Sequence, residues 1–202
     1  MGAGLRWLFA LNLIAACSVC GCGSSRHASS ASSLPGQLVL ESRPIGRGPR
    51  FHPPATGPVP GRCRPQLGRR IGAHLEVFAG NRVVLVAAGI GTRPPRALFA
   101  GRIAHAGCYG DVVTLDPTGL LLIRAGARLT VATVFRAWGQ PLSASRIASF
   151  AADRGQRVEV FVDGRRRAER PGDVPLTRHA EIVLEVGPYV PPHSTYTFPP
   201  GS

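Results

Sequence analysis

Three turn sequences between short apolar runs constrain the fold of this chain most strongly. They contain residue types that tolerate positive φ or form tight turns, so each is expected to join two antiparallel strands. The turns are Gly80-Asn81, Asp116-Pro117-Thr118-Gly119 and Asp163-Gly164. The sequence therefore predicts three hairpins, with strands over residues 73–79 and 82–88, 111–115 and 120–124, and 157–162 and 165–167.

One helix is predicted between the second and third hairpins. Within residues 131–138, apolar side chains recur at i, i+3, i+4 and i+7 and form one stripe. Thr130 precedes the stripe as an N-cap residue type, and Gly139 ends it. Residues 145–152 are expected to form a short helical turn.

The remaining segments predict a loop and a last strand. Residues 89–96 contain a Gly-x-Gly, but two prolines follow it where a phosphate-binding helix would begin, so a loop is expected. Residues 180–186 alternate in the manner of a strand. The element order predicts an α+β fold: a small, mostly antiparallel sheet of hairpins with one helix across it, in a β-grasp-like arrangement.

The N-terminus has the pattern of an export signal. Arg6 precedes the uncharged run Trp7 to Ala16, and Ile14-Ala15-Ala16-Cys17 resembles a bacterial lipobox. An apolar run of about ten residues is too short to span a bilayer core of about 30 Å as a helix, but it suits a signal peptide. The resemblance implies that residues 1–16 are removed and that the Cys17 thiol carries a diacylglyceryl anchor. An ordinary cleaved signal with an incidental cysteine is the alternative.

The residues after the signal predict a tether followed by one domain. Residues 23–36 are rich in Ser and Ala, and residues 43–62 combine Pro, Gly and Arg in a way that excludes a helix or a central strand. We expect a disordered stalk over residues 17–62 and a single domain over 63–202. The Pro-rich end of that domain, residues 187–202, is expected to lie extended over its surface.

Two of the five cysteines belong to the predicted domain. Disulfides persist in the oxidising space outside the cytoplasm, so Cys63 and Cys108 are expected to pair, whereas Cys20 and Cys22 lie in the stalk. The bond would close a loop of about 45 residues and contribute roughly 3 to 4 kcal/mol on the chain-entropy model.

The chain is strongly basic, with 24 basic residues against 11 acidic ones and a net charge of +13. Every basic residue is Arg, and a bias toward GC-rich codons explains much of this without a ligand. The alternative is attraction to anionic lipid head groups or acidic envelope polymers. The expected contact residues lie on the exposed return of the third hairpin: Arg165, Arg166, Arg167 and Arg170. Nucleic acid is not an expected partner outside the cell, and the oligomeric state is not indicated.

The sequence gives no catalytic pattern. No Gly-x-Ser-x-Gly is present, and the carboxylates are scattered over predicted strands. We therefore expect a protein that is not an enzyme and uses no cofactor. Within the predicted domain, the side chains that can ligate a metal lack a closed spacing such as Cys-x-x-Cys, so structural histidines are the expectation. These side chains are His74, His105, Cys108, Asp116 and His179. The candidates for a residual metal or redox site are His74, His105, Cys108 and Asp116.

Several short segments of the predicted domain resemble an uncharacterised family of exported bacterial, lipoprotein-like proteins. The resemblance covers nearly all of residues 63–202. It implies a histidine-rich cluster, because family members carry His-x-His before the first strand and Leu-His-Thr-His-Asp followed by Ile-His-x-Glu. The segments that carry the resemblance include Ala73-His74-Leu75-Glu76-Val77-Phe78, Cys108-Tyr109, Trp138-Gly139-Gln140-Pro141-Leu142, Val162-Asp163-Gly164 and Tyr196-Thr197-Phe198-Pro199-Pro200-Gly201.

This chain departs from the family pattern at its most polar positions. His74, Thr114 and Asp116 remain, but histidines are replaced by Gly72, Val113, Leu115 and Leu122, and a Glu by Arg124. Residues two apart share a strand face, so these changes turn a polar face apolar. We therefore expect no divalent metal at His74 and Asp116. We expect Val113, Leu115 and Leu122 to pack as core against the helix residues Val131, Phe135 and Trp138.

These features predict an exported, membrane-anchored protein of the bacterial cell envelope. Its expected role is that of a non-catalytic surface binding or scaffold module, held to the membrane through a lipid and in contact with anionic envelope components. The ligand is not indicated. The alternative is the residual metal-binding or redox protein described above.

Overall fold

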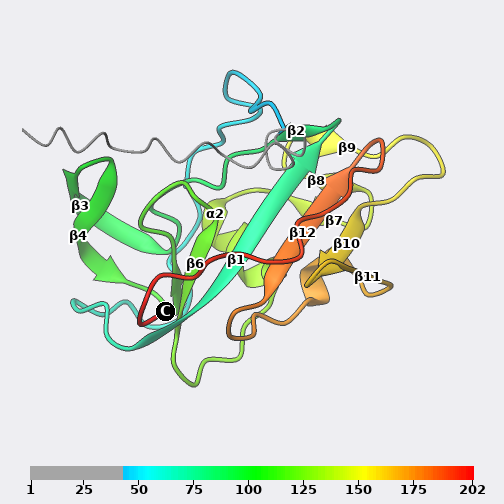
Figure 1. Cartoon of the computed structure of the whole chain (residues 1–202). Helices are drawn as coiled ribbons and strands as arrows, with labels where there is room; N and C mark the ends of the chain where they lie inside the picture. The colour runs from blue at the N-terminus through cyan, green and yellow to red at the C-terminus, as the bar shows by residue number, and fades with distance from the viewer. Residues whose placement is uncertain (1–42) are drawn as a thin grey trace, which may run out of the picture. The chain divides into compact units, whose positions relative to one another are not determined.

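The computed structural model describes residues 43–202, drawn in colour in Figure 1. The predicted signal peptide, Cys17 and the first part of the predicted stalk lie outside the described residues. The described part is an α+β structure, as the sequence predicts, with strands in several sheets and one α-helix, α2 (Val131–Trp138). No helix in this part of the chain is long and apolar enough to cross a bilayer.

The three predicted hairpins are present and supply most of the main sheet, although the strand predicted over residues 82–88 ends at Val83. Asn81 has φ 62° and Asp163 has φ 51°, each beside a glycine with positive φ, as such tight turns require. The hairpins are β1 (Arg70–Ala79) with β2 (Arg82–Val83), β5 (Val112–Val113) with β6 (Leu120–Arg124), and β10 (Glu159–Val162) with β11 (Arg165–Arg167).

The last strand, β12 (Glu181–Val186), joins the hairpins into one sheet of order β11-β10-β12-β1-β6-β5. It pairs with β1 in parallel and with β10 in antiparallel orientation. The parallel register places His74 opposite Glu181. The two strands at the centre of the sheet therefore come from the beginning and the end of the folded part.

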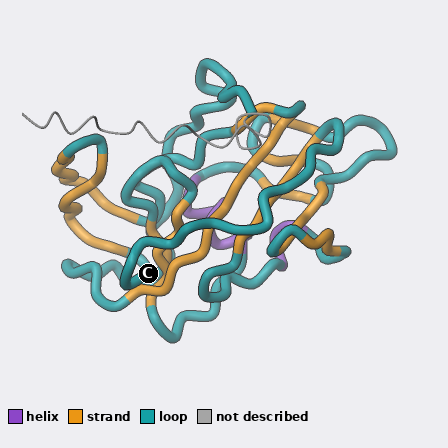
Figure 2. Tube along the Cα trace, viewed as in Figure 1, coloured by secondary structure: helices purple, strands orange, loops and turns teal. Residues whose placement is uncertain are grey.

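Helix α2 covers one face of this sheet (Figure 2). Its buried residues Val134, Phe135 and Trp138 belong to a core with Leu75, Val77, Leu121 and Ile123 and with alternate residues of β12. Gly139 ends the helix in the left-handed region, with φ 81°. The predicted helix and its boundaries are confirmed, although the side chain of Thr130 makes no capping hydrogen bond.

The opposite face is covered by the C-terminal segment 187–202, which runs across β1 and β6 in Figure 1. A second core forms there, and it contains Val113, Leu115 and Leu122 with Tyr196 and Phe198 against it. These three aliphatic residues are buried as predicted, but the predicted packing against α2 is wrong. Their immediate neighbours Val112, Leu121 and Ile123 face the helix instead. Both faces of the sheet are covered at β5 and β6, so both sets of alternate residues in these two strands are apolar. Alternation alone therefore does not reveal which set meets the helix.

Two segments differ from the predicted local structure. A loop was expected over residues 89–96, but its second half belongs to β3 (Thr92–Phe99), which pairs with β4 (Arg102–Tyr109). The prolines 94 and 95 lie at a shift in register, where the strand needs no regular ladder of N–H donors. The short helical turn expected over 145–152 is instead part of a small sheet of β7 (Leu142–Ser143), β8 (Arg146–Ile147) and β9 (Phe150–Ala151).

Residues 43–62, predicted to belong to the disordered stalk, pack on the domain. The Trp138 indole N–H donates to the carbonyl of Pro53 at 2.9 Å, and the Thr56 N–H donates to the carbonyl of Trp138 at 3.0 Å. The Phe51 and Phe150 rings lie 4.9 Å apart. The predicted domain boundary at Cys63 is therefore too late. A Pro-rich segment can be ordered without a helix or strand of its own when its carbonyls and N–H groups pair with those of a neighbouring helix end.

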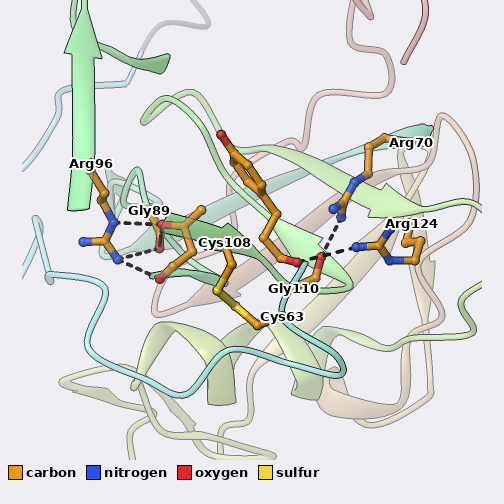
Figure 3. Close-up of a disulfide and its surroundings, with 9 residues drawn as sticks. Cys63, Arg70, Gly89, Arg96, Cys108, Gly110 and Arg124 are labelled. Carbon is orange, nitrogen blue, oxygen red and sulfur yellow. Dashed lines mark hydrogen bonds between the residues drawn. A yellow bond between two sulfur atoms is a disulfide. The ribbon is translucent and has the colours of Figure 1, made fainter. Parts of the chain in front are cut away.

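The predicted disulfide between Cys63 and Cys108 is confirmed (Figure 3). It ties residues 62–64 to the base of the β3–β4 hairpin, beside the bridge between Arg64 and Tyr109. Arg70 crosses the same region and donates to the carbonyl of Gly110 at 2.8 Å. The base of the hairpin is thereby fixed to the body of the domain.

Candidate functional site

A polar cluster lies on the face of the central strands that the C-terminal segment covers. His74 and Glu76 are two apart on β1 and share this face, while Leu75 and Val77 point to the helix side. Glu181 reaches the same face from β12, and His193 reaches it from the C-terminal segment. Four titratable side chains from three segments therefore meet under one cover.

The imidazole of His74 is held at both nitrogens. Its Nδ1 lies 3.0 and 2.9 Å from the two carboxylate oxygens of Glu181. Its Nε2 donates to the carbonyl of Thr118 at 2.7 Å. Gly119 makes this approach possible, because a Cβ there would lie 2.4 Å from the Leu75 carbonyl and 3.0 Å from His74 Nε2. Since a carbonyl only accepts, Nε2 carries a proton and Nδ1 is the nitrogen that faces the cluster.

Burial and charge act in opposite directions on this pair. Both side chains are almost fully buried, which disfavours either charged form. For His74 the hydrogen bond and charge of Glu181 outweigh burial, so its pKa is raised. For Glu181 burial outweighs the attraction of His74, so its pKa is raised as well. Glu181 therefore holds its proton to higher pH than an exposed carboxyl does, and the pair keeps one proton between Nδ1 and the carboxylate.

Glu76 has a histidine partner of its own. His193 Nδ1 lies 2.9 Å from both carboxylate oxygens of Glu76. This contact is less buried than the His74–Glu181 contact. It fixes the orientation of the Glu76 carboxylate beside the inner pair.

Aromatic rings of the C-terminal segment cover the cluster. The Tyr196 ring stacks on His74, with centroids 3.8 Å apart and an angle of 9° between the planes. Phe198 packs edge-on against Tyr196 and stacks on His179. The segment ends at the buried Ser202. The predicted extended tail is therefore a structural cover for the polar cluster, confirmed in its course over the surface.

A small cavity opens beside the cluster. It has a volume of about 110 Å³, and its lining includes His74, Glu76, Thr118 and His193 together with apolar residues 83–86. A space of this size accommodates a few waters or a bound ion. The cluster is thus reachable from one side by something small.

The ligating atoms of His74, Glu76 and Glu181 all lie within 4.8 Å of one another. Two atoms bound to one Zn²⁺ at about 2.0 to 2.2 Å are at most about 4.4 Å apart, so a small adjustment separates this set from coordination distance. The bond from Nε2 to a backbone carbonyl is the orientation that a metal-binding histidine usually has. One nitrogen and two carboxylates are suited to a divalent ion such as Zn²⁺ or Mn²⁺.

The other metal candidates chosen from the sequence are not part of this group. Cys108 is in the disulfide, and His105 is exposed on β4 opposite Ala97. Asp116 accepts a hydrogen bond from the Thr118 hydroxyl and lies 3.8 Å from Arg102. Among the described residues, His74 is therefore the one sequence candidate in the cluster.

The positions where family members are expected to carry histidines now have a different role. A Cβ on Gly72 would lie 2.9 Å from Ser202 and 3.1 Å from Phe198, so the C-terminal segment occupies that space. Arg124, in place of the expected Glu, pairs with Asp111 at 2.8 Å. These two positions therefore serve packing and an ion pair in this structure.

The arginines predicted to contact anionic surfaces lie at the edge of the main sheet. Arg165, Arg166 and Arg167 form β11 and are exposed, as predicted. Arg166 also pairs with Glu159 on the neighbouring strand β10. Arg170 is exposed just before a short 3-10 helix.

Sequence reasoning missed Glu76, Glu181, His193 and Tyr196 as members of the site. The alternation of β12 places Glu181 and Glu185 on one face, but carboxylates scattered over predicted strands indicated no site. The only available signal was the pair Glu181 and Glu185, placed on either side of Val183 in the last predicted strand before a Pro-rich tail. No protein-family model, curated protein or solved structure matches this chain.

Proposed function

We propose that this protein is a non-catalytic binding module of the bacterial cell envelope and that its ligand is a divalent metal ion, Zn²⁺ or a similar ion. The observation that carries this proposal is the convergence of a His74 ring nitrogen and the carboxylates of Glu76 and Glu181 within 4.8 Å. This differs from the expectation from the sequence, in which the loss of histidines removed any metal site. The ligands come instead from β12 and from residues that no local motif connects.

Burial supports a cation at this place. Two carboxylates lie close together on a covered face, and Glu76 contributes to the raised pKa of Glu181. Like charges under a cover disfavour each other, and a divalent ion would offset that repulsion. His193 would act on the ion indirectly, by orienting the Glu76 carboxylate.

Three protein ligands would leave one coordination position open, and two of them, His74 and Glu76, line the cavity. Structural zinc sites are closed by four protein ligands, whereas an open position admits water or another small ligand. The cover formed by Tyr196 and the cavity of about 110 Å³ limit that ligand to a small one. This argues for metal storage, transfer or sensing rather than a purely structural ion.

The strand order supports a β-grasp variant as the scaffold. Five strands run in the order β6-β1-β12-β10-β11, the central pair is parallel, and α2 follows β6 and precedes β10. Numbered along the chain, these five are the second, first, fifth, third and fourth strands, so the first and last strands lie together at the centre. The strands β2 to β5 would then be an insertion between the first two.

Export and lipid anchoring through Cys17 remain part of the proposal, supported by the lipobox pattern alone. A thioether-linked lipid requires the thiol, so the Cys17→Ser protein should be found unprocessed or released from membranes. Fractionation of parent and variant tests this step. Processing and membrane association equal to the parent would contradict the anchor but would leave the metal site untouched.

The metal site is tested by isothermal titration of the chelator-treated full chain with Zn²⁺. We expect one ion per chain for the parent, and an affinity at least about tenfold lower for Glu181→Gln and Glu76→Gln, the range typical of lost metal contacts. Asp116→Asn is the matched control, because it removes a carboxylate that the sequence suggested but the cluster does not use. Absence of stoichiometric binding in the parent, or equal binding by Glu181→Gln, would contradict the proposal.

A further inference from the structure

The β3–β4 hairpin exposes apolar side chains to a degree found nowhere else in the described chain. Leu98 is 71% exposed and Phe99 is 78% exposed. They lie side by side next to the turn Ala100-Gly101, which has positive φ at both residues. Figure 1 shows the hairpin extending to one side of the main sheet. Two adjacent large apolar residues at such a tip are poorly explained by folding of the domain alone.

The charges of the hairpin are all of one sign. Residues 92–110 contain three arginines and one histidine but no Asp or Glu. Arg102 is the direct cross-strand partner of Phe99, so a cation stands beside the exposed ring. The nearest carboxylate contact is the long one of 3.8 Å to Asp116, and the Arg102 side chain is still 55% exposed. The tip thus combines apolar residues with positive charge.

The hairpin is held firmly at its base, which leaves the tip presented in a fixed direction. Cys108 is bonded to Cys63, and Arg96 donates to the Thr92 hydroxyl at 2.8 Å and to the carbonyl of Gly89 (Figure 3). The Tyr109 hydroxyl accepts from the Ala106 N–H at 2.9 Å. These contacts order the base of the hairpin in advance, which lowers the entropic cost when the tip meets a partner.

We propose that the tip of the β3–β4 hairpin inserts into the head-group region of an anionic lipid bilayer. Leu98 and Phe99 would enter the boundary between head groups and acyl chains, and Arg102 would remain with the phosphates, as basic and apolar residues do in interfacial segments. The charge of the hairpin excludes a cationic partner, and a pair of side chains at a tip fits a fluid surface better than a shaped groove. The proposed insertion rests on the proposed envelope location, and it adds a membrane contact that the lipid anchor does not provide.

The location differs from the arginine edge that the sequence suggested. On β11 the three side chains are all arginines, and the charge of Arg166 is paired with Glu159. Purely electrostatic contacts of that kind are screened beyond about 8 Å at physiological salt. The hairpin tip combines burial of apolar side chains with charge attraction. Its contact with lipid should therefore persist at salt concentrations that release a contact made by charge alone.

The test is sedimentation of the unlipidated full chain, carrying Cys17→Ser, with vesicles of phosphatidylcholine and phosphatidylglycerol in equal amounts. Leu98→Ser/Phe99→Ser in this background should lower vesicle affinity by about tenfold or more at physiological salt. The matched control is Tyr189→Ser, which removes another exposed aromatic residue on the β12 side of the sheet. A third variant, Arg165→Gln/Arg167→Gln, should change binding at low salt only. Unchanged melting temperatures would show that each variant is folded.

Phe99→Trp gives a second measurement. The fluorescence that the new indole adds should shift to shorter wavelength and be quenched by brominated acyl chains when anionic vesicles are added. Equal vesicle binding by the parent and Leu98→Ser/Phe99→Ser, or indole fluorescence of Phe99→Trp that does not respond to the lipid, would overturn the inference. A parent that is dimeric while the Ser variant is monomeric would also overturn it, by assigning the tip to contacts between copies. Zn²⁺ titration of the same variants keeps a failure here distinct from a failure of the metal site.

Discussion

His74 and Glu181 are direct partners in the parallel β1–β12 ladder, and the Nδ1 of His74 lies 2.9 Å from a carboxylate oxygen of Glu181. The pair joins two strands that are 107 residues apart in sequence. It therefore links the two central strands of the sheet, and it supplies two of the three ligands of the proposed metal site.

Breaking this pair should destabilise the metal-free domain. Glu181→Gln leaves the His74 imidazole buried without its anion, and we expect a loss of roughly 3 kcal/mol in the free energy of unfolding. His74→Asn should cost a similar amount, and the double variant much less than the sum, because the two residues act together. Urea unfolding in the presence of a chelator measures all three. Glu169→Gln, at an exposed position, should stay within about 0.5 kcal/mol of the parent, and an equally small effect of Glu181→Gln would contradict the pairing.

Glu185 should make stability depend on pH. Burial, partly opposed by the Val190 N–H and by Arg43, raises its pKa from 4.5 to about 6, and Glu159 and Glu76 add to the rise. A raised carboxyl pKa means that the folded state favours the protonated form, so this contribution is fully present below pH 4.5 and is lost as pH rises through about 6. The ionised carboxylate is also poorly accommodated, because its Oε1 is buried without a hydrogen-bond partner among the described residues.

Glu185→Gln should therefore stabilise the protein above pH 6 by up to about 2 kcal/mol and have little effect below pH 4.5. The amide oxygen can still accept from Val190, so the variant removes the charge and keeps the contact. Denaturant unfolding across this range gives the difference from the parent. A stabilisation that is the same at acid and neutral pH would show that charge is not the cause.

The disulfide should stabilise the domain through the length of the loop it closes. Cys63 and Cys108 are 45 residues apart, and opening such a loop should lower the free energy of unfolding by roughly 3 to 4 kcal/mol. Cys63→Ser/Cys108→Ser measures this, and Cys20→Ser/Cys22→Ser is the control in the predicted stalk. Mass mapping of exported protein should find residues 63 and 108 bonded without prior reduction. Full alkylation of both thiols in unreduced protein would contradict the disulfide.

The hairpins and the helix were predictable because their causes are local. The turn at Asp163-Gly164 and the end of the helix at Gly139 each need positive φ within one or two residues, and the sequence states that need directly. The pairing of β1 with β12 has no such local cause, since a parallel register depends on everything between the two strands. Glu181 was thus visible on the correct face of β12 but without its partner.

The C-terminal segment that covers the His74 face of the sheet was also not predictable from the sequence. Residues 187–202 have no strand or helix of their own, so nothing in their pattern indicates that Tyr196 stacks on His74. Once the tail covers the sheet, the face of Leu115 becomes a second core, and the prediction that it meets α2 fails. The ordered structure of residues 43–62 was missed because it also depends on a contact that is distant in sequence, the hydrogen bond from Trp138 to the carbonyl of Pro53.

Leu115 provides the sharpest test of whether the second core can take part in metal binding. Its side chain is 7% exposed and lies in the second core with Ile103 and Leu122, under Tyr196 and Phe198. Leu115→His removes apolar burial worth roughly 1.5 to 3 kcal/mol and places an imidazole where a polar group without partners costs about 1 to 3 kcal/mol. The expected result is a loss of roughly 3 kcal/mol or more in the free energy of unfolding, with no new metal site.

Leu98→His is the matched control for this variant, because it makes the same substitution at an exposed position of the neighbouring hairpin and should be nearly neutral. Thermal unfolding of the parent and both variants, with and without Zn²⁺, separates the possibilities. In our proposal Zn²⁺ raises the melting temperature of the parent through His74, Glu76 and Glu181, and by no greater amount in Leu115→His. If Zn²⁺ stabilised Leu115→His more strongly than the parent, the new imidazole would be coordinating. The face of Leu115 would then contribute to the metal site, and the proposal that Glu76 and Glu181 are metal ligands would have to be replaced.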